Sequence, residues 1–491
     1  MSAPLVYEIN TRVWVRRFDA PDKRATLDDV PDTEWERLAA LGFNYVWLMG
    51  VWETVEKTIE KYALTPELEA EYRRALKDYD RRDVVGSPFA VADYDAREDL
   101  GGDAALARLR ERMRGYGLKL LLDFIPNHFS AESDLLYSEP EIFLQGTDED
   151  LDEDPDTFFR PEANPDKIFA HGRDPFFPAW TDTAQVNYFS EPARRAMIER
   201  LGSLAERCDG VRCDMAMLAL TNVFNNTWRG VAIRDGRAKP DEEFWTRAIR
   251  ETRAKREDFL FVAEAYWDME WSLMKTGFDF VYDKRLYDRL RHERARPIRD
   301  HLNADEAYSK RCVRFIENHD EARAANALGF DRSQAAAVII ATIEGMRLFH
   351  DGQFEGRRIK LPLQLGREPD ENEHPPLKAF YERLFELAND ETFHVGDFRV
   401  LRPEPAGPHD DTFHNLVAYE RASRDKTRVV VVNYSGVTSR CRLKLELPGF
   451  EEELQLVDLL QRKSYRRSAK EIRTEGLFVR LGAWRAHVFA F

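Results

Sequence analysis

The chain has 491 residues, of which 43% are hydrophobic and 12% aromatic, enough apolar material for a large folded core and too much for a disordered chain. Its formal net charge is −16, and its 73 basic residues are dispersed among 89 acidic ones, so no nucleic-acid or membrane partner is expected. MSAPLVYEIN lacks the features of a signal peptide and no apolar run is long enough to cross a bilayer, which makes the cytoplasm the expected location.

Short apolar runs recur along the first 350 residues and alternate with segments of helical period. The helical segments are Asp103–Tyr116, Glu191–Arg207 and Asp241–Lys255. The eight runs expected to form strands are Val6–Ile9, Tyr45–Met49, Lys119–Phe124, Gly210–Asp214, Phe259–Glu264, Phe278–Tyr282, Arg314–Glu317 and Arg347–His350. Strands that alternate with helices pair in parallel, and eight of them favour a closed barrel over an open sheet. The predicted fold class is therefore α/β, a (β/α)8 TIM barrel.

Two long segments interrupt this repeat, and both follow the carboxyl ends of predicted strands. Glu53–Arg82 is highly charged and helical in period, with Pro66 as an expected helix start. Residues 130–188 are rich in Asp, Glu, Pro and Phe and show little periodicity. A loop of that length favours a functional lid or a small excursion domain over a decorative loop. Barrel enzymes carry their active sites at this end of the barrel.

From about residue 395 the pattern changes to an alternation of period two. It runs through NLVAYERAS, TRVVVVNYS, RCRLKLELP and GLFVRLGAWRAHVFAF, which Gly, Asp and Ser turns separate. This pattern predicts an antiparallel β-sandwich. The predicted division is barrel residues 1–129, an excursion domain at 130–188, barrel residues 189–394 and a C-terminal β-sandwich domain at 395–491.

Ionisable and amide side chains gather where several of the predicted strands end. They are Asp123, Asn127 and His128 after the third strand, Arg212 and Asp214 in the fourth, Glu264 in the fifth, and Glu317, Asn318, His319, Asp320 and Glu321 around the end of the seventh. The carboxyl ends of barrel strands meet at one mouth, and a lone buried carboxylate is costly. Several converging carboxylates therefore indicate an active site.

The period-two alternation suggests a division of labour between two of these carboxylates. Arg212 and Asp214 share one strand face, so the guanidinium is expected to favour the ionised form of Asp214, as a nucleophile requires. Glu264 ends an apolar run, and such surroundings raise a carboxyl pKa, as a proton donor requires. Retaining glycoside hydrolysis needs this pair, with the carboxyl groups about 5–5.5 Å apart.

The segments DFIPNH, GVRCDMAM, AEAYW and FIENHD, in this order and spacing, resemble the four signature regions of the α-amylase superfamily, glycoside hydrolase family 13. The resemblance spans the barrel, and the β-rich tail is similar to the C-terminal domain of that family. It implies a retaining enzyme that cleaves or transfers α-glucosidic bonds of short α-glucans or related glucosides. Water, a second sugar or phosphate as the acceptor would make a hydrolase, a transglycosylase or a phosphorylase, and the sequence leaves this choice open.

The resemblance also implies a role for each matched residue. It implies Asp214 as the nucleophile, Glu264 as the general acid/base and Asp320 as the third carboxylate, which binds sugar hydroxyls. The implied substrate-binding residues are Arg212 beside the nucleophile, His128 and His319 at the cleavage subsite, Asp123 as a supporting aspartate, and Phe89 as the ring stacked on the sugar. Phe89, in SPFAVADY, replaces the usual tyrosine of the family and keeps its apolar face. The sequence does not decide whether Asp123 supports the scaffold or contacts the sugar.

No cofactor is expected to be required, because the proposed chemistry needs no metal. Met217 and Leu218 stand where many α-amylases carry a Lys–His pair that helps to bind calcium. Asn127 matches the calcium shell, but one oxygen ligand is far short of the roughly six to eight that calcium takes. Structural calcium is thus possible but unsupported. The four cysteines form no CxxC pair, which predicts buried reduced thiols.

Other kinds of protein remain as alternatives. A non-catalytic carbohydrate-binding or assembly module of the same fold would be marked by loss of a triad carboxylate, and none is lost. A metal-dependent barrel enzyme would need a tighter cluster of His and carboxylate ligands, which metal analysis would reveal. A phosphorylase or isomerase of the same family also stays open. Carbohydrate is the expected partner, and the sequence does not define linkage, chain length or oligomeric state.

Overall fold

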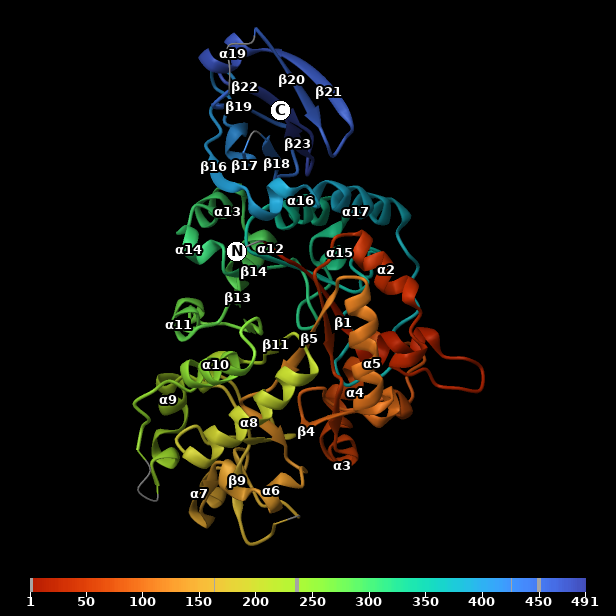
Figure 1. Ribbon diagram of the computed structural model, residues 1–491, viewed down its shortest axis with the longest axis vertical. Helices are drawn as coiled ribbons and strands as arrows, with labels where there is room; N and C mark the ends of the chain where they lie inside the picture. Colours follow the sequence, from red (N-terminus) through yellow and green to blue (C-terminus); the bar gives the residue numbers. More distant parts are fainter. Residues whose placement is uncertain (1–2, 163, 235–237, 425, 448–451) are drawn as a thin grey trace.

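The computed structural model describes residues 3–162, 164–234, 238–424, 426–447 and 452–491. Eight parallel strands close into a barrel in the order β1-β15-β14-β13-β12-β11-β5-β2 (Figure 1). Their bounds are β1 Leu5–Asn10, β2 Tyr45–Met49, β5 Lys119–Phe124, β11 Gly210–Cys213, β12 Leu260–Ala263, β13 Phe280–Tyr282, β14 Cys312–Arg314 and β15 Met346–His350. The predicted (β/α)8 barrel is confirmed. No helix within the described ranges is long and apolar enough to span a bilayer.

The seventh predicted strand was placed too late in the chain: β14 spans Cys312–Arg314 instead of Arg314–Glu317. Arg314 can lie inside a buried strand because its Nε pairs with Asp283 Oδ2 at 2.8 Å. After the strand, Asn318 Oδ1 accepts two backbone N–H groups from the residues that follow it, each at 3.0 Å. This side-chain turn directs the polar ENHDE segment into the rim of the barrel instead of the sheet.

Alternate strand residues divide between two cores, as the period of a strand requires. Inward-facing side chains fill the barrel, among them Val6, Trp47, Met49, Leu121, Val262, Phe280, Tyr282, Val313, Met346 and Leu348. The other set packs against surrounding helices, which include α5 (Gly102–Gly115), α8 (Glu191–Arg207) and α10 (Phe244–Lys255). Arg212 is level with inward-facing Val262 in the sheet register, and Cys213 lies in the outer core.

The two insertions lie at the carboxyl mouth of the barrel. In the first, α4 (Pro66–Ala75) begins at the expected proline, and the hydroxyl of Thr65 accepts the Leu68 N–H at 3.3 Å. Strands β3 (Trp52–Thr54) and β4 (Val91–Ala96) pair on either side of this insertion. The second insertion holds the sheet of β7 (Gln145–Gly146), β9 (Ile168–Ala170) and β8 (Phe158–Phe159), while β6 (His128–Ser130) pairs with β10 (Thr183–Gln185).

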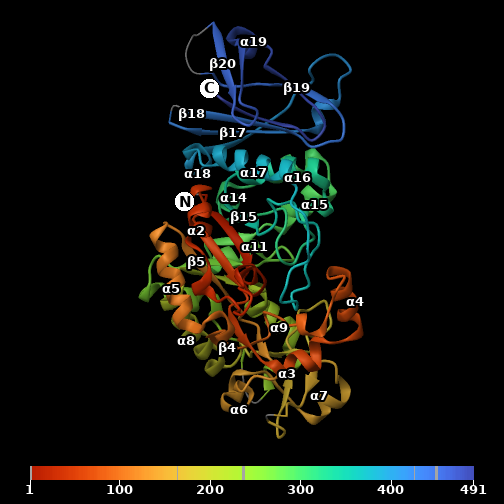
Figure 2. The same cartoon turned by 90° about the vertical axis from the view of Figure 1, so that its right-hand side faces the viewer.

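The C-terminal strands form two antiparallel sheets at the end of the molecule opposite the second insertion (Figures 1 and 2). Their bounds are β16 Asp397–Leu401, β17 Leu416–Ser423, β18 Lys426–Asn433, β23 Ala486–Ala490, β20 Glu453–Asp458 and β21 Lys463–Ser468 in the larger sheet, and β19 Ser439–Leu443 and β22 Leu477–Leu481 in the smaller. One face of the larger sheet covers the smaller sheet. Its other face shares the outer core of the barrel and packs on α16 (Gly329–Thr342).

Candidate active site

Arg212 lies at the centre of the predicted site, inside the barrel and near the carboxyl ends of its strands. Its Nη1 contacts Asp214 Oδ1 at 2.7 Å, and its Nη2 lies 2.9 Å from Glu264 Oε2. Asp123 Oδ1 is 3.5 Å from the same Nη1. The side chains of Arg212, Asp214 and Glu264 are each at most 8% exposed. One buried guanidinium thus holds carboxylates from β5, β12 and the end of β11 together.

Aromatic faces enclose this guanidinium. Its central carbon lies 5.1 Å from the ring centre of Trp47, 5.5 Å from that of Phe89 and 5.7 Å from that of Tyr282. The Tyr282 hydroxyl is also 3.4 Å from Arg212 Nε. A delocalised cation is attracted to such ring faces, which partly offset the loss of water around it. The three rings thereby hold in place the guanidinium that the two carboxylates contact.

Glu264 has donors on both carboxyl oxygens. Oε2 accepts the Met215 N–H at 2.6 Å in addition to its contact with Arg212, and Oε1 accepts the Tyr266 hydroxyl at 2.9 Å. Met215 adopts a left-handed conformation with φ 41°, which directs its N–H at the carboxyl group. Burial raises the pKa of Glu264 to about 7; Arg212 opposes the rise and the Asp214 charge adds to it. The carboxyl group therefore holds a proton near neutral pH, as the apolar run before it predicted.

His319 links the rim of β14 to the first strand. Its Nδ1 lies 2.5 Å from Glu8 Oε1 and its Nε2 lies 3.1 Å from Asp320 Oδ2. Burial alone would lower the pKa of His319, but the charges of Asp320 and Glu8 outweigh it and raise the pKa to about 10. His319 in turn holds the pKa of Asp320 well below its usual range, against the effect of burial. Asp320 is thus charged at the barrel mouth.

The remaining predicted residues lie around the same centre. Burial raises the pKa of Asp123 to about 7 against the pull of Arg212, which suits a neutral scaffold group. Burial lowers the pKa of His128, so its ring is neutral, and Trp180 packs edge-on against it with ring centres 5.3 Å apart. The half-buried Phe89 ring lies 5.5 Å from the His319 ring. All eight predicted residues therefore surround one mouth of the barrel.

Three residues of this constellation escaped the sequence reasoning: Glu8, Tyr266 and Tyr282. Glu8 lies within the apolar run Val6–Ile9, and a lone carboxylate among buried Val6, Tyr7 and Ile9 is the signal that could have identified it. The two tyrosines carried no such signal, because tyrosine is common in strands and near strand ends.

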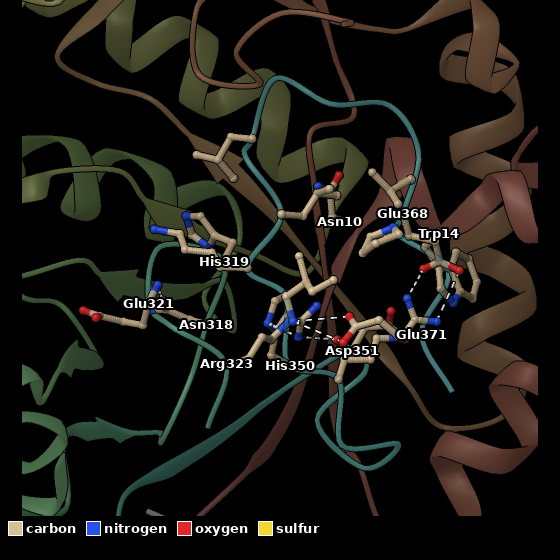
Figure 3. A pocket seen from close by; sticks show the side chains of 17 residues that line it. Asn10, Trp14, Asn318, His319, Glu321, Arg323, His350, Asp351, Glu368 and Glu371 are labelled. Atoms are coloured by element: carbon tan, nitrogen blue, oxygen red, sulfur yellow. Dashed lines mark hydrogen bonds and ion pairs between the residues drawn. The ribbon is translucent and has the colours of Figure 1, made fainter. Parts of the chain in front are cut away.

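A pocket opens beside His319, between the ends of β1, β14 and β15 and the loop that follows β15 (Figure 3). Asn10, Glu321, Arg323 and Asp351 line it, together with residues between Arg357 and Glu371. Arg323 Nη1 donates to the carbonyl oxygen of Asp351 at 2.7 Å across its floor. Asp214, Glu264 and Asp320 are not among its lining residues, so this pocket adjoins the carboxylate cluster instead of containing it.

The possible metal ligands do not gather into a site. No group of three or more His, Cys, Asp or Glu side chains within the described residues is arranged to hold a metal ion. Asn127, the match to a calcium shell, instead accepts the Gln185 side-chain N–H at 3.0 Å through its Oδ1. Its residue type fits a calcium ligand, but its amide oxygen serves to join β6 to β10. All four cysteines are free and buried, as expected.

Comparisons with known proteins agree with this fold. The chain is 26% identical over 442 residues to the α-amylase MalA of Haloarcula japonica, covering 88% of this chain and 55% of that relative. The chain thus spans about half the length of this relative. No protein-family model matches it.

Solved structures resemble the whole chain. A maltogenic α-amylase, AmyB from Thermotoga neapolitana, superposes with a TM-score of 0.70 at 19% identity, covering 99% of this chain and 98% of its own. The α-amylase of Geobacillus thermoleovorans, solved with acarbose, gives 0.68 at 16% identity over the same shares of the two chains. The chain is thus similar in sequence to an α-amylase, and its closed barrel has the fold of the solved α-amylases.

Proposed function

We propose that this protein is a retaining glycoside hydrolase or transglycosylase that acts on α-glucosidic bonds of short α-glucans by double displacement. The observation that carries the proposal is the shared guanidinium of Arg212, whose two outer nitrogens contact Asp214 at 2.7 Å and Glu264 at 2.9 Å. Retaining enzymes need one ionised and one protonated carboxyl group only about 5–5.5 Å apart. Because both carboxylates contact the same guanidinium, they lie close together, as double displacement requires.

The two carboxyl groups differ in the way that the reaction requires. Asp214 forms a direct ion pair with Arg212, which holds its carboxylate in position to attack the anomeric carbon. Glu264, with a pKa raised to about 7 by burial, keeps the proton that the departing oxygen takes up. As the C1–O bond breaks and the bond from Asp214 to C1 forms, that proton passes to the leaving oxygen. Glu264 then removes a proton from the acceptor, which attacks C1 and releases the sugar.

The surrounding residues suit the binding of one glucose ring. Asp320 is charged and lies at the mouth, so it can accept two sugar hydroxyls. His319 is protonated and His128 neutral, which provides a charged donor and a neutral partner on the ring hydroxyls. The half-exposed face of Phe89 can stack on the apolar face of the sugar.

The test is product analysis with maltose, maltotriose, sucrose, trehalose and starch, each with and without phosphate. We expect release or transfer of glucose units with retained α-configuration at C1, observed by proton NMR in the first minutes. Phosphate is expected to change neither rate nor product. An inverted first product would contradict double displacement, and a sugar phosphate would make the enzyme a phosphorylase.

Two variants assign the roles. Asp214→Asn is expected to lose activity by about 10³-fold or more on every substrate, because the covalent step needs the charged oxygen. Glu264→Gln should lose it mainly on substrates whose leaving group needs a proton. An Asp214→Asn protein with wild-type activity would show that the nucleophile is misassigned. Unchanged thermal melting of both variants controls for the fold.

A further inference from the structure

Tyr266 lies two residues beyond Glu264, on the loop that leaves β12. Its hydroxyl is 2.9 Å from Glu264 Oε1, and that contact is distinct from those on the other oxygen. Oε2 already faces the Arg212 guanidinium at 2.9 Å and the Met215 N–H at 2.6 Å. The two oxygens of this carboxyl group are therefore in different environments.

The environments decide where a proton can reside. A guanidinium and a backbone N–H donate and cannot accept, so a proton on Oε2 would face two donors with no acceptor. A tyrosine hydroxyl can donate and accept. When Glu264 is ionised, the Tyr266 O–H donates to Oε1; when Glu264 is protonated, the proton on Oε1 is donated to the Tyr266 oxygen.

We propose that Tyr266 is a positioning residue that holds the transferable proton of Glu264 on Oε1, the oxygen away from the Arg212 guanidinium. This proposal rests on the function proposed above. In the first chemical step the proton leaves Oε1 for the glycosidic oxygen, which receives the electron pair of the breaking C1–O bond. The Tyr266 O–H then donates to the Oε1 that has lost its proton. Tyr266 itself gains and loses no proton in the cycle.

The backbone of the loop after β12 supports this role for Tyr266. Trp267 and Asp268, which follow Tyr266, have φ values of 56° and 64°, a conformation that side chains with a Cβ rarely adopt. The Asp268 carboxylate pairs with Arg285 on α12 (Lys284–His292), which anchors the loop outside the mouth. The strained turn lies directly beyond Tyr266.

Several charged or titratable groups act on Glu264 besides Tyr266. Arg212 and Asp214 act from β11 and its end, Asp320 from the loop after β14, and the Tyr282 hydroxyl from β13. A tyrosine that donates to the ionised carboxylate favours that form and lowers its pKa. Removing only the hydroxyl is therefore expected to raise the pKa of Glu264 and leave the other groups in place.

The experiment compares wild type, Tyr266→Phe and a matched control, Tyr72→Phe. The Tyr72 hydroxyl donates to the Ala63 carbonyl oxygen at 2.8 Å in the first insertion, so its loss removes a buried hydrogen bond remote from the site. Each protein is assayed on maltose and on α-glucosyl fluoride over a range of pH. Fluoride departs with little need of a proton, so it reports the displacement without the acid.

For Tyr266→Phe we expect kcat/KM on maltose to fall about tenfold, a part of the roughly 10²–10⁴-fold that a positioned acid contributes, and to fall far less on α-glucosyl fluoride. The alkaline limb of the maltose profile should move to higher pH. Tyr72→Phe should keep both the profile and the ratio between substrates. Equal losses on both substrates with an unmoved alkaline limb would overturn the proposal.

A measurement without turnover separates this proposal from the proposed function. Infrared difference titration follows the C=O band of the protonated carboxyl group, which Glu264→Gln removes and so identifies. A midpoint at higher pH in Tyr266→Phe supports the proposal even if no substrate is found. An unchanged midpoint refutes it even if the wild type is an active glucosidase. Wild type without activity on any α-glucoside would refute the proposed function alone.

Discussion

Glu264 links the structure to a pH dependence at the scale of a single residue. Because burial raises its pKa to about 7, the proton needed by the leaving group is present below that pH and lost above it. We expect kcat/KM on maltose to fall as pH rises through about 7, with the limb absent in Glu264→Gln. Steady-state rates between pH 5 and 9 measure this. A wild-type profile that stays flat to pH 9 would contradict the acid role.

His319 gives a second pH dependence, this time in stability. Its pKa of about 10 in the folded protein lies far above the usual value of 6.5 for histidine, because Asp320 and Glu8 face it. The folded state therefore holds this proton more tightly than the unfolded state does. The resulting stabilisation is complete below about pH 6.5 and is lost as pH rises toward 10.

We expect urea denaturation to show a free energy of unfolding that declines between pH 7 and 10. Glu8→Gln removes one of the two charges that raise the pKa of His319, so the decline should be smaller in that variant. Lys23→Gln, at an exposed ion pair with Asp29, serves as the control and should follow the wild type. A Glu8→Gln slope identical to that of wild type would refute this account.

The gathering of charged side chains at the strand ends was predictable residue by residue, and the network of contacts beneath them was not. The sequence alone indicates Asp214, Glu264 and Asp320, because a carboxylate that follows an apolar run is costly to bury and points to a functional site. Glu8 pairs with His319, 311 positions later, although β15 separates their strands in the barrel. The way in which the barrel closes decides which strands lie near one another, and no local sequence pattern encodes this.

At the scale of elements, the loop between β9 and β10 brings exposed aromatic rings toward the β12 end of the mouth. Phe176 and Phe177 are 67% and 66% exposed, and the Phe176 ring meets that of Trp267 at 4.9 Å. Trp267 follows Glu264 by three residues. Under the proposed function, we expect these rings to stack on the leaving or accepting sugar.

Replacing both phenylalanines by alanine is expected to lower transfer to an added maltose acceptor about tenfold relative to hydrolysis, because stacking on the acceptor is lost. α-Glucosyl fluoride is the donor, so that the first step needs no sugar in the leaving-group site. Tyr137→Ala, which removes a 71% exposed ring from the same insertion, is the matched control. An unchanged ratio of transfer to hydrolysis would assign the rings to another purpose.

Arg12 joins three segments at the other side of the mouth. Buried in the helix α1 (Thr11–Trp14), it donates to the carbonyl oxygens of Val85 at 3.3 Å, Gly86 at 3.0 Å and Leu363 at 2.6 Å. It thereby ties the end of the first insertion to the loop after β15. The sequence offered no sign of this, since an arginine in an N-terminal segment reads as solvent-exposed.

Arg12→Met is expected to lower the free energy of unfolding by about 2–4 kcal/mol, because it leaves buried carbonyl groups without donors. Urea denaturation measures the change. Arg82→Met, at an exposed ion pair with Asp80 in the same insertion, should leave the free energy of unfolding close to that of wild type. Equal effects of the two substitutions would show that the Arg12 contacts are not what stabilises the mouth.

At the scale of the whole molecule, the C-terminal sheets were predicted as an attachment, and the structure joins them closely to the barrel. Val417, Tyr419, Val430 and Val432 lie in the same core as the barrel helices, and the Thr342 and Tyr419 hydroxyls are 2.6 Å apart. The alternating sequence showed that one face of each strand is apolar. It did not show that the helices of the barrel cover one of those faces.

A continuous core predicts a single unfolding event. Scanning calorimetry of the whole chain is expected to show one transition, and a chain ending at Val395 is expected to be insoluble or unfolded because its outer core would be bare. Two resolved transitions, or a stable truncated barrel, would show that the sheets are an independent unit.

The closing of the barrel has a consequence for synthesis on the ribosome. Strand β1 pairs with β15, and Glu8 of that first strand holds His319. A nascent chain therefore carries its opening segment unpaired on one edge until Met346–His350 has left the exit tunnel. Until then this apolar edge of β1 is open to other unpaired strands.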